Sequence, residues 1–342
     1  MRHAVSFMPY FPDEEINEVL GDFHVWNWRR NAQQLVADAR IRAYLTRYFG
    51  LYKTVKGKPE SRIAVVSPVT GDPFPADQDF FRLSRFNNAL MASYLFNLPL
   101  NSNWPLCLSD NFTGLHQPFD ADTDDPTIAF NFGSYLQVKQ AGSWDYLTFA
   151  TPQFMPDMGQ CRPVDRLLPL LVGLLGDKSA AINRLFRSLE WLRVAFLNYE
   201  NVPNDVRLVA MCSAFEALLD LPEFKKAENF SNQVNGLLPA NRLPTISQQI
   251  RNTTVTDTAV GWWCREFYSL RSKLVHGEET TPQDLLHDTG AEHLKIAINI
   301  FEECVWGLLV KWSILSPDDR MMEFMWRSNW RDLLGVQMAA FI

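Results

Sequence analysis

The spacing of apolar residues predicts a mixture of helices and strands over residues 1–155. Leu35, Ala39, Ile41 and Leu45 recur near the helical period and predict a helix over Asn31–Tyr48. A second helix is expected at Asp77–Asn97, and a loop rich in Pro, Asn and Asp at Leu98–Asp125. Four short strands are expected at Arg62–Ser67, Ile128–Phe132, Tyr135–Lys139 and Tyr146–Ala150. This pattern indicates an α+β N-terminal domain.

Helical spacing dominates residues 164–342. The predicted helices are Val164–Leu175, Ser179–Tyr199, Asn204–Asp220, Phe224–Leu238, Thr258–His276 and a long one from Pro282 to about Leu315. Asn204 or Asp205 can cap one helix start and Asp257 another, while Gly277 lies where glycine commonly ends a helix. The short connections predict an antiparallel bundle. We therefore expect a mainly α protein, with an α+β domain at 1–155 and an all-helical bundle at 164–342.

Composition narrows the functional classes. The chain has 342 residues and a formal net charge of -7, so no general basic character suggests broad nucleic-acid binding, and DNA is not an expected partner. Its five cysteines are scattered without a CxxC pair, which favours buried free thiols over disulfides. The start of the chain lacks a signal-peptide pattern, and no apolar stretch is long enough to span a bilayer. These features predict a cytoplasmic protein that does not enter a membrane.

Two segments of the second half form a recognisable pattern. The first, RLVAMCSAFEALLDL, contains the run Glu-Ala-Leu-Leu that starts at Glu216. The second, FYSLRSKLVHGEE, contains Arg271, four intervening residues, His276 and then a glycine. Together with the upstream helix RLFRSLEWLRVAFLNYE, they resemble the Apea-like branch of the HEPN superfamily, over the last half of the chain. A strand in the motif region would contradict this resemblance.

The resemblance implies a chemistry for these residues. HEPN nucleases cleave RNA without a metal: a histidine takes the proton of a ribose 2′-OH, which attacks the adjacent phosphate, while an arginine binds that phosphate. Arg271 and His276 are then the catalytic pair, supported by Glu216, Ser272 and Tyr268, with no cofactor. The usual pKa of histidine and the fork of the guanidinium suit these roles. The implied function is an endoribonuclease in prokaryotic defence or toxin-like regulation.

The motif helix also predicts an assembly. At about 100° per residue, its apolar stripe faces the bundle core, and Arg271 and His276 lie about 140° apart. They cannot share a proton on one straight helix. The face between them contains Tyr268 and Ser272, beside Val275, and is too apolar for a solvated surface. We therefore expect a homodimer in which each Arg271 faces the partner's His276. The stripe consists of Trp263, Phe267, Leu270 and Leu274.

Several alternatives remain open. Ser272 stands where nuclease members usually have Asn, Asp or His, so a non-catalytic HEPN module for dimerisation or RNA sensing is one alternative, and a nucleotide-binding module is another. His276 can equally be a plain helix-terminal residue, and Arg271 part of an ion pair. No segment has the pattern of a metal site, because His287 and His293 would point to different faces of the predicted long helix and are interpreted as surface residues.

Two further features of the sequence allow both a functional and a structural interpretation. The stretch Trp26–Arg30 could stack on bases, although packing inside the N-terminal domain is the commoner role of such residues. Cys264 has no evident base beside it in the sequence, so it is interpreted as a packing thiol.

Overall fold

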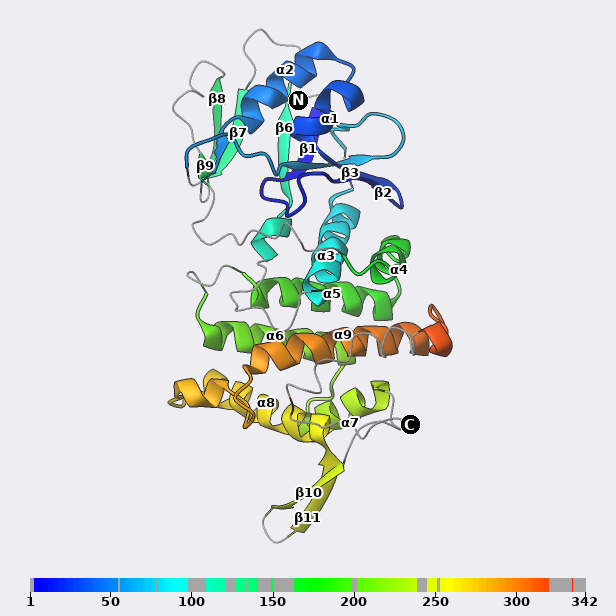
Figure 1. Ribbon diagram of the computed structural model, residues 1–342, viewed down its shortest axis with the longest axis vertical. Helices are drawn as coiled ribbons and strands as arrows, with labels where there is room; N and C mark the ends of the chain where they lie inside the picture. Colours follow the sequence, from blue (N-terminus) through cyan, green and yellow to red (C-terminus); the bar gives the residue numbers. More distant parts are fainter. Residues whose placement is uncertain are drawn as a thin grey trace. The chain divides into compact units, whose positions relative to one another are not determined.

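The computed structural model divides the chain into two compact units, the first formed by described residues up to Gly176 and the second from Asp177 onward. Figure 1 labels the helices and strands. The structure describes residues 3–54, 56–77, 79–97, 109–120, 127–132, 135–140, 149–150, 163–197, 202–238, 245–250, 253–319 and 334.

An antiparallel sheet of five strands organises the first unit, in the order β2-β3-β5-β1-β6. The strands are β1 (His3–Met8), β2 (Asn17–Leu20), β3 (Phe23–Asn27), β5 (Ala64–Pro68) and β6 (Leu115–Phe119). Register pairs such as Ser6 with Val66 and Val5 with Gln117 place β1 between β5 and β6. Strands more than 100 residues apart in the sequence, β1 and β6, thus pair in one sheet.

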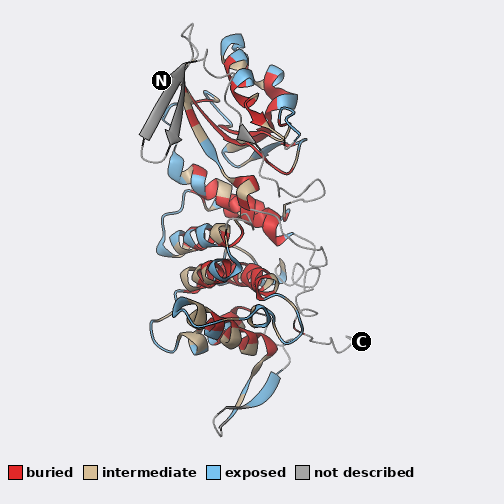
Figure 2. Cartoon of the chain, turned by 90° about the vertical axis from the view of Figure 1, so that its left-hand side faces the viewer, coloured by how far each residue is buried: buried red, intermediate tan, exposed pale blue. Residues whose placement is uncertain are grey.

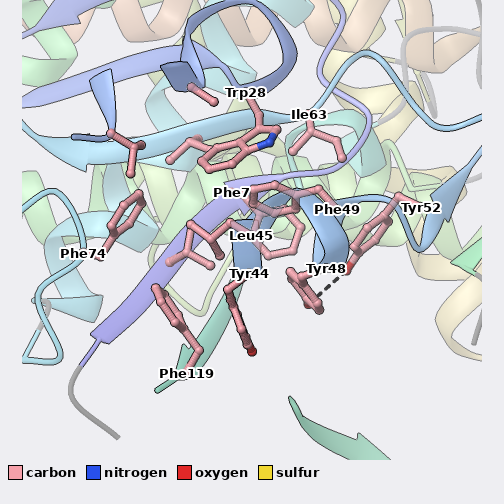
Figure 3. Close-up of a cluster of buried hydrophobic side chains, with 14 of the residues drawn as sticks. Phe7, Trp28, Tyr44, Leu45, Tyr48, Phe49, Tyr52, Ile63, Phe74 and Phe119 are labelled. Atoms are coloured by element: carbon pink, nitrogen blue, oxygen red, sulfur yellow. Dashed lines mark hydrogen bonds between the residues drawn. The ribbon is translucent and has the colours of Figure 1, made fainter. Parts of the chain in front are cut away.

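Helices cover both faces of this sheet. α1 (Trp28–Leu35) and α2 (Ala39–Phe49) enclose an aromatic core in which Phe7 lies 4.9 Å from Phe49 between ring centroids (Figure 3). Strand residues alternate between faces, so Phe23 points away from this core and packs on Phe86 of α3 (Phe80–Phe96), 4.6 Å between centroids. Trp26 and Trp28 are buried, which supports the packing role considered for them over base stacking.

Several elements of the first unit differ from the sequence prediction. The helix expected over Asn31–Tyr48 is interrupted, because Val36 is extended and Asp38 caps a new helix by accepting from the amides of Arg40 and Ile41. Strands β1, β2, β3 and β6 were not predicted. The remaining elements are β4 (Tyr52–Lys53), η1 (Ser109–Phe112), β7 (Thr127–Phe132), β8 (Tyr135–Gln140) and β9 (Phe149–Ala150). Strand predictions at β5, β7 and β8 are confirmed, whereas residues 98–108, 121–126 and 146–148 lie outside the described residues.

The boundary between the units also moves. The predicted second domain began at residue 164, yet α4 (Leu167–Gly173) belongs to the first unit. The Val164 amide donates to Ser93 O at 2.9 Å, and Arg85 Nη1 donates to Leu175 O at 3.2 Å. These bonds connect the segment to α3, which the local sequence pattern could not reveal.

The second unit packs its helices around α6. It contains α5 (Ala180–Ala195), α6 (Asn204–Leu219), α7 (Lys226–Leu237), α8 (Ala259–Val275) and α9 (His293–Lys311). Phe215 of α6 lies at the centre of the core, with ring centroids 5.0 Å from Phe230 of α7 and 5.2 Å from Phe301 of α9. Helix α9 is buried along most of its length (Figure 2). The prediction of a mainly α protein with an N-terminal α+β part is confirmed.

The expectation that this half is all helical is wrong. A hairpin of β10 (Thr245–Ile250) and β11 (Thr253–Thr258) precedes α8, and its described side chains are exposed or half-buried (Figure 2). Its threonines alternate, which is typical of a strand. The two motif segments themselves contain no strand. The predicted long helix after Pro282 is wrong as well: a 3-10 turn, η4 (Pro282–Leu285), is followed by a loop with positive φ at Gly290, and α9 starts only at His293.

A helix that spans a bilayer must be both long and apolar. Over the described residues, none of the helices combines the length and hydropathy needed to cross a membrane.

Candidate functional site

Helix α8 carries most of the predicted site residues and is fixed firmly at its start. Thr258, not Asp257, is its N-cap, and Thr258 Oγ1 accepts from the Gly261 amide at 2.8 Å. Asp257 instead connects α8 to α7, since its carboxylate accepts from Ser231 Oγ at 2.8 Å and Arg265 Nε at 2.9 Å. Burial by itself would raise the pKa of Asp257, but the hydrogen bonds from Ser231, Arg265 and the Thr258 amide lower it.

The predicted apolar stripe anchors the middle of α8. Trp263, Phe267 and Leu270 are buried, and Leu274 is half-buried near the helix end. The rings of Trp263 and Phe267 stack at 4.9 Å between centroids, and both approach Phe215. This part of the helix prediction is confirmed, and it fixes the direction in which the opposite face of α8 points.

Glu216 of α6 is the centre of a polar cluster beside that face. Its Oε1 accepts from Tyr268 Oη at 2.7 Å and lies 3.7 Å from both Arg271 Nη2 and Lys226 Nζ. We call Glu216, Lys226, Tyr268 and Arg271 the Glu216 cluster. The side chains of Glu216 and Arg271 are 22% and 23% exposed, so the ion pair is partly shielded from water.

The cluster holds a fixed charge pattern. Burial raises the pKa of the Tyr268 phenol, and its hydrogen bond to Glu216 raises it further, so Tyr268 remains a neutral donor. Arg271 Cζ lies 5.7 Å from the centre of the Tyr268 ring, a cation–π distance. One carboxylate therefore faces two permanent cations, and the cluster is left with a formal charge of about +1 near neutral pH. Arg271 Nε is buried without a hydrogen-bond partner among the described residues.

His276 ends α8 at the surface. Gly277 has a φ of +71°, its amide donates to Leu274 O at 3.2 Å, and the Glu278 amide donates to Lys273 O at 3.0 Å. These two bonds form a Schellman motif, which confirms the predicted glycine cap. His276 is the C-cap residue and is exposed. In the described part of the chain, its side chain has no hydrogen bond or ion pair, and none connects it to Arg271.

The structure therefore brings only some of the predicted site residues together. Glu216, Tyr268 and Arg271 are in contact, whereas Ser272 is half-buried and His276 lies apart. Tyr268 was expected at an interface between subunits, but its own chain covers it, with the Phe230 ring 6.2 Å from its ring centre. Lys226 was missed, because it comes from α7 and no spacing rule connects it to the motif.

A second polar cluster was also missed. The prediction that His287 and His293 are surface residues facing apart is wrong, because a loop separates them: His293 is buried, and their ring centroids lie 6.2 Å apart. His287 Nε2 and His293 Nε2 lie 3.7 Å and 3.5 Å from the two carboxylate oxygens of Glu266. We call Glu266, His287 and His293 the Glu266 cluster. Burial lowers the pKa of His287, while the charge of Glu266 opposes this shift.

The Glu266 cluster is arranged for hydrogen bonding. Trp263 Nε1 donates to His293 Nδ1 at 3.2 Å, so a neutral His293 carries its proton on Nε2, directed at Glu266. Among the residues that the structure describes, no group of three or more His, Cys, Asp or Glu side chains has the arrangement of a metal site.

Three cysteines of the second unit, Cys212, Cys264 and Cys304, are free and buried, as predicted. Burial raises the pKa of Cys264 far above its usual value, which fits a packing thiol. Comparisons with protein-family models, with curated proteins and with solved structures find no match for this chain.

Proposed function

We propose that the second unit is a metal-independent endoribonuclease of the HEPN type, with Arg271 binding the scissile phosphate and His276 acting on the ribose 2′-OH. The observation that carries this proposal is the position of Arg271, whose guanidinium is oriented by Glu216 and Tyr268 on the helix that ends in exposed His276. A preoriented guanidinium loses less freedom when it binds a phosphate.

The chemistry requires a proton acceptor and a phosphate-binding cation. In the proposed step, a ring nitrogen of His276 takes the 2′-OH proton, the 2′ oxygen bonds to phosphorus, and the bond from phosphorus to the 5′ oxygen breaks. A proton returns to that oxygen, so the products are a 2′,3′-cyclic phosphate and a 5′-hydroxyl end. Exposed His276 is accessible to RNA, and Arg271 with Lys226 offsets the negative charge that develops on the phosphate.

We propose a composite site in a homodimer, which the placement of the pair supports. Arg271 points toward α6 and α7, while His276 lies at the helix end without a contact to it. A two-fold contact through the last turn of α8 would let Arg271 of one protomer face His276 of the partner subunit. Since Tyr268 is covered by its own chain, this contact would use exposed Val275 and half-buried Ser272. We further propose a role in prokaryotic defence or toxin-like regulation, as the resemblance suggests.

Cleavage of a fluorescently labelled single-stranded RNA in EDTA tests the proposal. His276→Gln and Arg271→Ala should each lower the rate by about 100-fold or more, because a general base contributes about 10²–10⁴. Lys273→Ala is the matched control for Arg271, since Lys273 lies two residues further along α8 and its Nζ is 3.7 Å from Asp284. It should leave the rate unchanged.

A mixture of the two inactive variants tests the shared site. A heterodimer of Arg271→Ala and His276→Gln chains retains one intact pair across the interface, so partial activity should return. Loss of activity in EDTA that returns with divalent metal would show that the mechanism is wrong. If the wild type binds RNA but does not cleave it, the non-catalytic RNA-sensing module is favoured. Full activity of a verified monomer would exclude the shared site.

A further inference from the structure

A cleft in the first unit lies between α1 and α2 and has a volume of about 850 Å³. Residues near Pro59 and Ile63, which precede β5, complete its wall. Its size is within the range of about 300–1,000 Å³ that is typical of small-molecule sites. Every residue that lines it belongs to the same unit.

The inner wall of the cleft is apolar and firmly packed. Trp28, Phe49 and Ile63 are each at most 6% exposed and belong to the aromatic core (Figure 3). The rings of Trp28 and Phe49 meet edge to face with centroids 5.0 Å apart. Ala32 of α1 and Ala43 of α2 line the cleft, and their short side chains leave the space between the helices open. The wall therefore suits a planar or apolar group.

Arginines line the outer part of the cleft. Arg29 comes from α1, and Arg42 and Arg47 come from α2. The one lining carboxylate, Glu60, has a side chain only 1% exposed and accepts from Arg62 Nε at 3.0 Å, so its charge is already compensated. On a chain with a formal net charge of -7, this is a local concentration of positive charge.

Two neighbouring arginines on the same helices, Arg30 and Arg40, form ion pairs with carboxylates. Arg30 Nη2 lies 3.2 Å from Glu15, and Arg40 Nη2 lies 3.7 Å from Asp38. Within the described residues, neither Arg29 nor Arg42 lies within ion-pair distance of a carboxylate. Arg42 Nη1 donates to the Val36 carbonyl, which holds this guanidinium at the wall. The cleft therefore offers uncompensated guanidinium groups beside an apolar surface.

We propose that this cleft binds a small phosphate monoester with a planar or apolar organic part, of about mononucleotide size. A phosphate monoester carries close to two negative charges near neutral pH and accepts forked hydrogen bonds from arginine, which matches the guanidinium groups of Arg29 and Arg42 better than a single carboxylate. The organic part lies against Trp28 and the alanines. The first unit is then a ligand-binding domain, and this inference does not depend on the Arg271 site.

Isothermal titration calorimetry of the full chain with AMP and with phenyl phosphate tests the proposal. Both ligands should bind, while adenosine, inorganic phosphate and glucose 6-phosphate should bind at least about tenfold more weakly, since each lacks one half of the recognised chemistry. Arg29→Ala and Arg42→Ala should weaken binding of AMP by at least about tenfold. Ala43→Leu, which fills the cleft from an exposed position, should also block it.

Matched variants separate the cleft from general surface charge. Arg30→Ala and Arg40→Ala remove the paired arginines of the same helices and should leave AMP binding within about twofold of wild type. Arg271→Ala and His276→Gln should also leave it unchanged, which distinguishes this site from the proposed nuclease site. Absence of binding by both AMP and phenyl phosphate at about 1 mM would overturn the proposal. So would equal losses in Arg29→Ala and Arg30→Ala, or glucose 6-phosphate binding as tightly as AMP.

Discussion

Two carboxylates of the second unit, Glu216 and Glu266, are each the centre of a cluster that includes residues of helix α8, but their partners differ. Glu216 faces Arg271 and Lys226, which are charged at any physiological pH. Glu266 faces His287 and His293, and burial lowers the pKa of His287. Helix α8 thus contributes Tyr268 and Arg271 to a cluster with two cations near its end, and Glu266 to a cluster with two histidines nearer its middle.

The two clusters are therefore expected to differ in how their net charge depends on pH. The Glu216 cluster has one more cation than carboxylates, which suits the proposed binding of a phosphate. The Glu266 cluster connects the loop before α9 to α8 through His287, whose pKa is lowered by burial. Three predictions, two of them with a matched variant, test this contrast in order of decreasing expected effect on the free energy of unfolding.

Removal of the Glu216 carboxylate should have the largest effect. Glu216→Ala leaves the Tyr268 hydroxyl and two cations without their acceptor, so the free energy of unfolding should fall by about 1–3 kcal/mol in urea titrations. Glu228→Ala is the matched control, because Glu228 pairs with Lys225 at 3.5 Å on the exposed surface, and its loss should change stability by less than about 0.5 kcal/mol. Equal effects of the two substitutions would show that the Glu216 cluster is an ordinary surface ion pair.

Replacement of Gly277 at the end of α8 should lower the free energy of unfolding by a smaller amount. Gly277 has a φ of +71°, so Gly277→Ala should destabilise the protein by about 1 kcal/mol and displace His276, lowering the proposed nuclease rate as well. Gly236 lies inside α7, and a Cβ added there would meet no atom within 4 Å. Gly236→Ala should therefore stabilise the protein by about 0.5–1 kcal/mol. Thermal unfolding of both variants gives the two signs directly.

The smallest effect is the pH dependence of the Glu266 cluster. Because burial lowers the pKa of His287, the unfolded chain takes up its proton at a higher pH than the folded chain does. Stability from this group is complete above about pH 6.5 and is lost as the pH falls below that value, until the folded chain also takes up the proton. His287→Asn should flatten this slope relative to wild type in urea titrations at several pH values.

The comparison with wild type is needed because burial also lowers the pKa values of His24 and His116 in the first unit. Their contributions cancel in the difference between the two proteins. An unchanged slope in His287→Asn would mean that the Glu266 cluster is not sensitive to pH.

Periodicity predicted elements well where local interactions decide them. The motif helix was found within a residue at each end, since its apolar stripe and Gly277 are local signals. Asp257 was wrongly assigned as the cap, because Ser231 and Arg265 compete for its carboxylate from other parts of the fold. The break before α9 was missed because positive φ at Gly290 was not evident from composition.

The sequence by itself determined the mainly α character, the course of α8 and the presence of Arg271 and His276 near its end, since each depends on residues a few positions apart. Only the tertiary structure decided which groups meet. Lys226 joins Glu216 from another helix, His287 and His293 converge on Glu266 across a loop, and Arg29 and Arg42 line one cleft from two helices. Such contacts depend on how helices pack, and packing is set by the shapes of many buried side chains together rather than by any local pattern.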